Sequence, residues 1–140
     1  ERLNLGFQTT ELQTDPATEN AMIILVNKER TQKGLNALVF NEGLREVGRL
    51  HSKDMFERGY FAHYSLEGES VADRASKQDA DFLVIGENLA FAPNLELAHQ
   101  GLMNPEGHRA NILSPDFGRI GIGVIDGGIY GKMFTQVFTN

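Results

Sequence analysis

Apolar positions recur every three or four residues through the first half of the chain, the spacing that puts side chains on one face of a helix. The first such segment begins at Asp15-Pro16, where a capping residue precedes a proline at the first helical position. Its apolar positions include Ala21, Ile24 and Leu25, and it ends at Lys33-Gly34, a basic last turn followed by glycine. The pattern predicts a helix over residues 16–33.

A second helix is predicted between Asn41 and Gly59. Its apolar face repeats at intervals of three and four and consists of Leu44, Val47, His51 and Met55. His51 therefore lies on the stripe that we expect to be buried.

Shorter helices are indicated by their start signals. Ser70 with Asp73 has the spacing of a capping box, although aspartate is less usual than glutamate at the second position. Asn94 begins another helix, and Asn104-Pro105 begins a last helical turn that extends to Leu113.

The strands gather late in the chain. Phe82 to Ile85 is a short apolar run stopped by Gly86, which predicts a buried strand. Segments 119–125 and 129–138 flank Asp126-Gly127-Gly128 and predict a β-hairpin. Helices followed by strands favour an α+β class, or a layered α/β/α domain with an antiparallel sheet, over a doubly wound parallel fold.

Length and composition suggest one folded domain preceded by a short arm. Residues 1–14 are polar and aperiodic, which predicts a weakly ordered arm or linker remnant outside the core of a domain at 15–140. The chain has 140 residues, 41% of them hydrophobic, an ordinary globular composition. Because the first residue is Glu1, we expect a mature or trimmed segment, in which a removed leader or anchor would not be visible.

Charge and cysteine content exclude several classes of function. A formal net charge of −6, with no block of Lys and Arg, argues against nucleic-acid binding. No apolar run approaches the roughly 20 residues that span a bilayer. The absence of cysteine rules out a thiol nucleophile, a thiolate metal site and disulfides.

Two of the four histidines have ordinary structural interpretations. His99 lies among polar helix neighbours, which predicts a solvated surface residue. His51 is interpreted as a hydrogen-bonded core histidine and kept as a reserve candidate for a site.

His63, Glu87 and His108 are the residues that we expect to converge on one polar pocket. Glu87 stands between apolar segments, so its carboxylate should be partly buried and in need of a cation, a metal or several donors. An imidazole from His63 or His108 would serve, although backbone donors around a purely structural glutamate remain an alternative.

Seven segments in order resemble the CAP superfamily, also called the SCP domain, of the bacterial secreted type. They are Val26-Asn27-Lys28-Glu29-Arg30 with Gly34-Leu35, His51-Ser52-Lys53-Asp54-Met55, Tyr60-Phe61-Ala62-His63, Gly86-Glu87-Asn88-Leu89-Ala90, Met103 to Leu113, Ile120-Gly121-Ile122-Gly123 and Phe134-Thr135-Gln136-Val137-Phe138. The similarity covers about residues 17–140.

The resemblance implies a three-layer α/β/α sandwich, an extracellular or cell-surface location and a cavity that in many relatives is lined by two histidines and two glutamates able to bind a divalent metal. His63 and Glu87 match the first histidine and first glutamate, and Glu106 lies near the second glutamate. Where eukaryotic relatives place the second histidine, this chain has Met133, a poor ligand for such a cation. We hypothesise that His108 replaces it, with His63, His108 and Glu87 binding a metal such as zinc.

Two functions follow from these residues. We favour a binding or interaction module that recognises an extracellular protein, a cell-wall component or a small apolar, lipid-like ligand. The alternative is a metal-assisted, peptidase-like hydrolase in the same cavity, with Glu87 as candidate general base. In a third interpretation Ser65 is a nucleophile, but it more simply caps its loop.

Overall fold

The computed structural model describes residues 2–104 and 108–140. Within these residues the elements, in chain order, are β1 (Leu3–Asn4), β2 (Gln13–Thr14), α1 (Pro16–Gln32), β3 (Val39–Phe40), α2 (Glu42–Arg58), β4 (Tyr60–Phe61), α3 (Val71–Lys77), β5 (Ile85–Ala92), α4 (Leu95–Leu102), α5 (His108–Ile112), β6 (Arg119–Asp126), the short 3-10 helix η1 (Gly128–Tyr130) and β7 (Lys132–Thr139). None of the helices in these ranges combines the length and apolar character needed to cross a bilayer.

The central sheet is built on three long antiparallel strands in the order β6, β7, β5. The outer edge of β6 pairs with β2 at one end, antiparallel, and with β3 at the other, parallel. The predicted hairpin is confirmed as β6 and β7, joined through η1. Among the described residues β5 pairs with β7 on one side only, so it forms an edge of the sheet.

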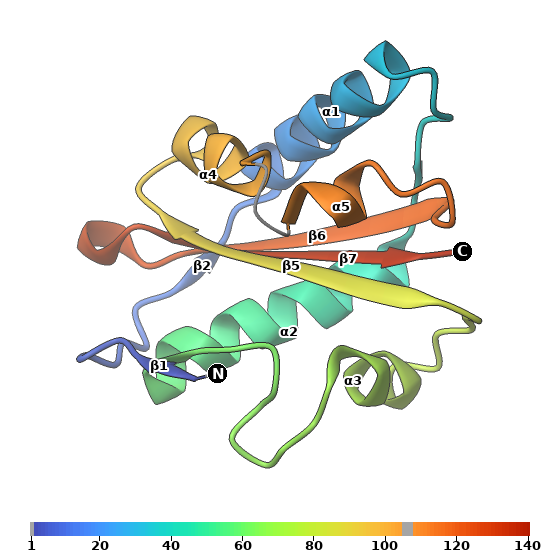
Figure 1. Ribbon diagram of the computed structural model, residues 1–140. Coiled ribbons are helices and arrows are strands. Elements are labelled where there is room, and N and C mark those ends of the chain that lie inside the picture. The colour runs from blue at the N-terminus through green and yellow to red at the C-terminus, as the bar shows by residue number, and fades with distance from the viewer. Residues whose placement is uncertain (1, 105–107) are drawn as a thin grey trace.

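Helices cover both faces of this sheet (Figure 1): α1, α4 and α5 lie on one side and α2 and α3 on the other. Side chains alternate along each strand, so each strand contributes to the apolar cores on both faces of the sheet. On β7, Phe134 and Phe138 pack in the core beneath α1, α4 and α5, whereas Val137 packs against α2 and Met133 lies in the core cluster formed with Met55 and Phe56 of α2. The predicted α+β class and three-layer sandwich with a mainly antiparallel sheet are confirmed.

Glycines let α2 approach the sheet with backbone against backbone. A Cβ on Gly123 would lie 2.0 Å from the Arg49 amide nitrogen, and one on Gly121 would lie 2.1 Å from that of Arg45. Gly48 of α2 meets the sheet equally closely, 2.8 Å from the Gly123 nitrogen. No side chain fits at these positions, so the sequence places α2 at a fixed, short distance from β6 and β7.

Four of the five predicted helix starts are confirmed. Asp15, Asn41 and Asn94 each accept a hydrogen bond from a backbone amide three residues ahead, and Ser70 with Asp73 forms a capping box. These side chains satisfy amides that the first helical turn leaves without partners. The start predicted at Asn104-Pro105 falls partly outside the described residues, and α5 is described from His108.

The buried face of α1 differs from the predicted one. Ile24, expected to face the core, is 69% exposed, and the buried stripe is Glu19, Met22, Val26 and Arg30. Glu19 accepts hydrogen bonds from Arg49 at 2.6 and 2.7 Å and from the Val124 amide. Because the buried stripe begins with Glu19 and ends with Arg30, the spacing of apolar residues did not reveal it.

Two other segments also differ from expectation. The strand predicted at residues 82–85 begins at Ile85 and continues through Gly86 to Ala92, while Leu83 is 90% exposed. The N-terminal arm docks on the domain, because β1 and β2 pair with β4 and β6 and Phe7 stacks on Tyr130 at 4.0 Å between ring centroids. The division of the chain at residue 15 stays a prediction.

Candidate functional site

His63 and Glu87 meet beside the face of the sheet that α2 and α3 cover. Gly59 ends α2 in a left-handed conformation with φ of 73°, and the buried Tyr60 anchors the turn that leads to His63. The His63 Nδ1 atom lies 2.9 Å from Glu87 Oε1, close enough to donate a hydrogen bond to the carboxylate. The expectation that His63 points inward holds only partly, since its side chain is 54% exposed.

Arg74 completes this cluster and was missed in the sequence. From the last turn of α3 its guanidinium donates to both Glu87 oxygens, at 3.0 and 3.2 Å, and to the His63 carbonyl at 2.6 Å. The signal was available: the capping box at Ser70 starts α3, and Arg74 precedes the buried Ala75 on that short helix. We call His63, Glu87 and Arg74 the carboxylate cluster.

The electrostatics of the cluster hold Glu87 in its charged form. Its side chain is 2% exposed, and burial alone would raise its pKa. The hydrogen bond from His63 and the positive charge of Arg74 outweigh burial and bring the pKa of Glu87 below its usual value. The sequence left a cation, a metal or several donors open as partners of this carboxylate, and in the structure the partners are an arginine and a histidine.

His108 lies on the other face of the sheet. Glu87 is opposite Val137 in the ladder and faces α2 and α3, whereas the next residue, Asn88, is opposite Gln136 and faces α5. The side-chain amide of Asn88 donates to the His108 carbonyl at 2.9 Å, which holds the start of α5 on that face of the sheet. The structure thus brings His63 and Glu87 together and does not bring His108 to them; Glu106 lies outside the described residues.

The predicted metal ligands do not fit a zinc ion as they stand. Residues 2–104 and 108–140 contain no group of three or more His, Asp or Glu side chains that could hold a metal. Both oxygens of Glu87 already accept from Arg74, and His108 is on α5 across the sheet. Met133, which stands where the resemblance implies a second histidine, is fully buried and packs in the core with Met55 and Phe56.

The remaining candidate residues have mostly structural contacts. Ser65 accepts a hydrogen bond from the Glu69 amide at 3.0 Å, as expected of a loop cap. The prediction that His99 is a solvated surface residue is wrong, because its side chain is 11% exposed and its Nε2 lies 2.9 Å from Glu29, which links α4 to α1. His51 is 1% exposed with its Nε2 2.7 Å from the Ala62 carbonyl, as a hydrogen-bonded core histidine should be.

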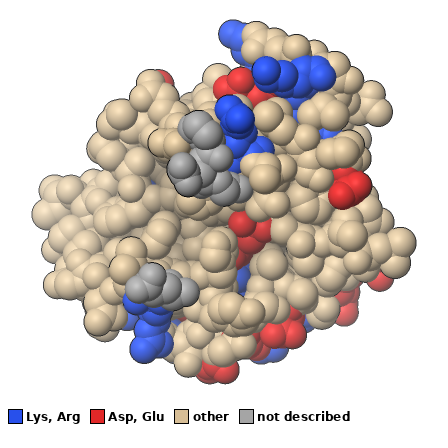
Figure 2. All heavy atoms as spheres, in the orientation of Figure 1, with Lys and Arg blue, Asp and Glu red and all other residues tan. Residues whose placement is uncertain are grey.

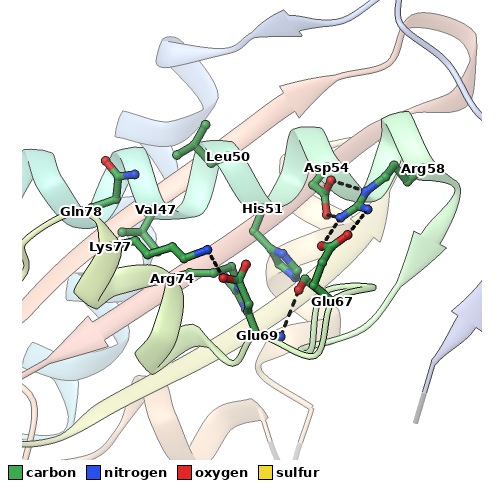
Figure 3. Close-up of a pocket in the computed structure, with 11 residues that line it drawn as sticks. Val47, Leu50, His51, Asp54, Arg58, Glu67, Glu69, Arg74, Lys77 and Gln78 are labelled. Carbon is green, nitrogen blue, oxygen red and sulfur yellow. Dashed lines mark hydrogen bonds and ion pairs between the residues drawn. The ribbon is translucent and has the colours of Figure 1, made fainter.

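His51 also contributes to a pocket of about 230 Å³ between α2 and the segment that leads into α3. Figure 3 shows its ring pointing from α2 toward Glu67, with the pair of Arg58 and Glu67 on one side and that of Lys77 and Glu69 on the other. Arg74 belongs to the wall of this pocket as well as to the carboxylate cluster. On the face drawn in Figure 2, Lys and Arg form small separate groups.

Comparisons with known proteins agree with this architecture. The model of the cysteine-rich secretory protein family, CAP, matches residues 23–138. Two Bacillus subtilis proteins, the uncharacterized protein YkwD and the uncharacterized membrane protein YlbC, are each 36% identical to the chain, over 87% and 86% of its length. The chain spans only 47% of YkwD and 34% of YlbC.

A solved structure shares both fold and sequence with this chain. The crystal structure of an extracellular protein containing an SCP domain from Bacillus anthracis superposes with a TM-score of 0.81 at 31% identity. The match covers 90% of this chain and 41% of the Bacillus anthracis chain.

Proposed function

Because the chain belongs to the cysteine-rich secretory protein (CAP) family, we propose that it is an extracellular or cell-surface binding domain that recognises a component of the bacterial cell wall. A neighbour at 31% identity is described as extracellular, which supports the location. The fold alone names no activity, since one fold carries many functions. Support for a binding role comes from the carboxylate cluster.

The proposal is supported mainly by the charge and the hydrogen bonds of Glu87. A general base needs a pKa near the working pH and a free lone pair, but the pKa of Glu87 is held below its usual value and its oxygens accept from Arg74 and His63. The carboxylate instead fixes the orientation of the His63 ring and of the Arg74 guanidinium. With Nδ1 donating to Glu87, the other nitrogen of the half-exposed His63 is left to contact a ligand.

Co-sedimentation with purified, insoluble bacterial cell walls tests this role. We expect the wild type to sediment with the walls, His63→Ala to bind less, and Asn20→Ala, an exposed change on α1, to bind like the wild type. Phospholipid vesicles form a second arm for the lipid-like ligand. Binding to vesicles and not to walls, or binding that is indifferent to His63→Ala, would overturn the proposal.

The hydrolase alternative is tested by zinc titration in a calorimeter on the wild type, His63→Ala and His108→Ala, near neutral pH. We expect no specific heat that depends on both histidines, because α5 and the carboxylate cluster lie on opposite faces of the sheet. A panel of peptides and esters with added zinc follows. Turnover lost in both variants would replace the binding role by metal-assisted hydrolysis.

A further inference from the structure

A compact turn forms the wall of the pocket opposite α2. Residues 65–69 close on themselves: the Ser65 amide donates to the Glu69 carbonyl at 2.9 Å, the Gly68 amide to the Ser65 carbonyl at 2.9 Å, and the Glu69 amide to Ser65 Oγ at 3.0 Å. Gly68 has a φ of 85°, a conformation that glycine adopts without strain. These bonds hold the turn together as one unit, and Ser65, Glu67 and Glu69 of this unit line the pocket.

The turn makes little apolar contact with the rest of the domain. In the part of the chain that the structure describes, the apolar core clusters include Ala62 and Val71 but no residue between them. Leu66, the aliphatic residue of the turn, is 39% exposed, and Tyr64, just before the turn, is 61% exposed. Hydrophobic burial therefore contributes little to holding the turn against α2 and α3.

Two ion pairs link the turn to the helices on either side of the pocket (Figure 3). Arg58 of α2 pairs with Glu67 at 2.5 Å, and Lys77 of α3 pairs with Glu69. The hydrogen bonds from Arg58 lower the pKa of Glu67 to about 2, so this carboxylate is charged near neutral pH. The exposed fractions of the four side chains lie between 27% and 64%. Because exposed ion pairs are weak and are screened by salt, these contacts hold the turn only loosely.

The chain on both sides of the turn is fixed more firmly. Arg74 donates to the His63 carbonyl at 2.6 Å on one side, and Ser70 caps the first turn of α3 on the other. The turn can therefore move as a unit about Tyr64 and Ser70, without disturbing the carboxylate cluster or α3.

Such a movement would change the charge of the pocket. Three basic and three acidic residues line it, and two of the acidic ones are Glu67 and Glu69 of the turn. When the turn moves away, three basic residues face one acidic residue of the lining. One positive charge is still in excess after Glu87, the partner of Arg74, is counted. An anionic ligand therefore prefers the open pocket, and such a difference in affinity is what allows a ligand to shift an equilibrium between two states.

We propose that residues 64–69 form a lid over the pocket between α2 and α3, and that an anionic ligand binds the open pocket in place of the two glutamate carboxylates of the lid. The ligand contacts Arg58 and Lys77, which the lid occupies in the closed form, so the lid is autoinhibitory. The assignment rests on the proposed binding function and deepens it, because it names acidic groups as the part of the cell wall that is recognised.

Chemical modification of His51 tests the lid in the wild type. His51 lines the pocket, is 1% exposed and points toward Glu67 (Figure 3), so diethyl pyrocarbonate should modify its ring slowly while the lid is closed. Raising NaCl from about 0.05 M to about 1 M should accelerate this modification at least threefold, because salt screens the two ion pairs. His63, which is 54% exposed, is followed in the same sample by mass spectrometry and corrects for any effect of salt on the reagent. A corrected rate that does not change with salt would overturn the lid.

Two double variants separate the lid from net charge. The lid variant, Glu67→Gln with Glu69→Gln, removes both ion pairs without changing side-chain size, and His51 should be modified about threefold faster than in the wild type at low salt. The surface variant, Glu11→Gln with Glu46→Gln, removes two exposed carboxylates elsewhere and should behave like the wild type. The midpoint of urea unfolding should stay near the wild-type value in both, which distinguishes lid opening from loss of folding. Equal rates at His51 in the two variants would contradict the assignment.

Calorimetric titration with inorganic pyrophosphate, at constant ionic strength set with NaCl, tests the ligand class. The lid variant should bind about threefold tighter than the wild type, because a larger fraction of its molecules is open. The surface variant should bind like the wild type, and Lys77→Met should bind more weakly. Equal affinity in the lid and surface variants, or no binding to the lid variant, would overturn the anionic ligand.

Co-sedimentation identifies the source of the acidic group and keeps the two proposals apart. Pyrophosphate should release the protein from cell walls; release from anionic phospholipid vesicles in place of walls would assign the acidic group to a lipid headgroup. A protein that sediments with walls, but whose His51 is modified equally in the lid variant and the wild type, keeps the binding function and loses the lid. A protein whose lid variant binds pyrophosphate, but which does not bind walls, keeps the lid and loses the cell-wall function.

Discussion

Replacing Arg74 by methionine keeps most of the length and the apolar stem of the side chain but removes the guanidinium that neutralises Glu87. Three hydrogen bonds are lost, two to the carboxylate and one to the His63 carbonyl. Removing one partner of a buried ion pair costs about 3–5 kcal/mol. We expect about 3 kcal/mol, the lower end, because Glu87 keeps its hydrogen bond from His63.

Urea unfolding followed by circular dichroism, at about pH 7.5, gives the free energy of unfolding. The matched control is Lys77→Met, which removes a cation from the same helix at a side chain that is 64% exposed and should change stability little. With Glu87→Gln as the second change, the double variant should lose about 1–3 kcal/mol less than the sum of the single losses. Additivity within about 0.5 kcal/mol, or a loss no larger than that of Lys77→Met, would refute the reasoning.

The pH dependence of Arg74→Met offers a second check. Without the guanidinium, burial should raise the pKa of Glu87, so protonation relieves the unpaired charge as the pH falls. The stability deficit of this variant relative to the wild type should therefore be smaller at about pH 5 than at about pH 7.5. A deficit that grows toward acid would mean that Arg74 does not neutralise Glu87.

Three further outcomes are expected from urea unfolding. Gly123→Ala should cost about 3 kcal/mol or more, or prevent folding, because the added Cβ meets the α2 backbone. The control Gly101→Ala on α4, whose Cβ would have nothing within 4 Å, should gain about 0.5–1 kcal/mol of stability. Equal effects of the two changes would contradict the close approach of α2. Because burial lowers the pKa of His51, the unfolded chain binds more protons than the folded chain below about pH 6.5. The contribution of the neutral His51 ring to stability is therefore fully present above that pH and is lost as the pH falls. In His51→Gln the free energy of unfolding should decline less steeply toward acid. Phe7→Ala should cost about 1–2 kcal/mol, since the half-buried ring stacks on Tyr130; no change would mean that the arm does not dock.

Local signals predicted the helices well because they act within a few residues. Asn41 and Ser70 each satisfy amides of the helix that they start, whatever the rest of the chain does. The hydrophobic period located the buried face of α2 for the same reason. It failed on α1, where Glu19 and Arg30 are buried with partners far away in sequence.

The site depended on contacts that sequence spacing does not encode. That a buried Glu87 needs a cation, a metal or several donors could be predicted, but the choice of Arg74 depends on where α3 lies against β5. The sequence grouped His108 with Glu87, whereas in the structure β5 runs through Gly86 and Glu87 and α5 packs on its other face. Side chains alternate along that strand, so Asn88, one residue further on, contacts α5 on the opposite face.

The close approach of α2 to β6 also determines which wall of the pocket between α2 and α3 can move. Gly48, Gly121 and Gly123 bring backbone against backbone, and Ser52 is hydrogen-bonded to both Gly123 and Thr135, so α2 cannot shift without breaking the packing of the sheet. On the opposite wall, residues 64–70 are held through polar contacts of Glu67 and Glu69, whereas α3 also packs Ala75 against Leu44 and Val47 of α2. Differences in ligand size among relatives should therefore map to changes in residues 64–70, with the glycines beneath α2 left untouched.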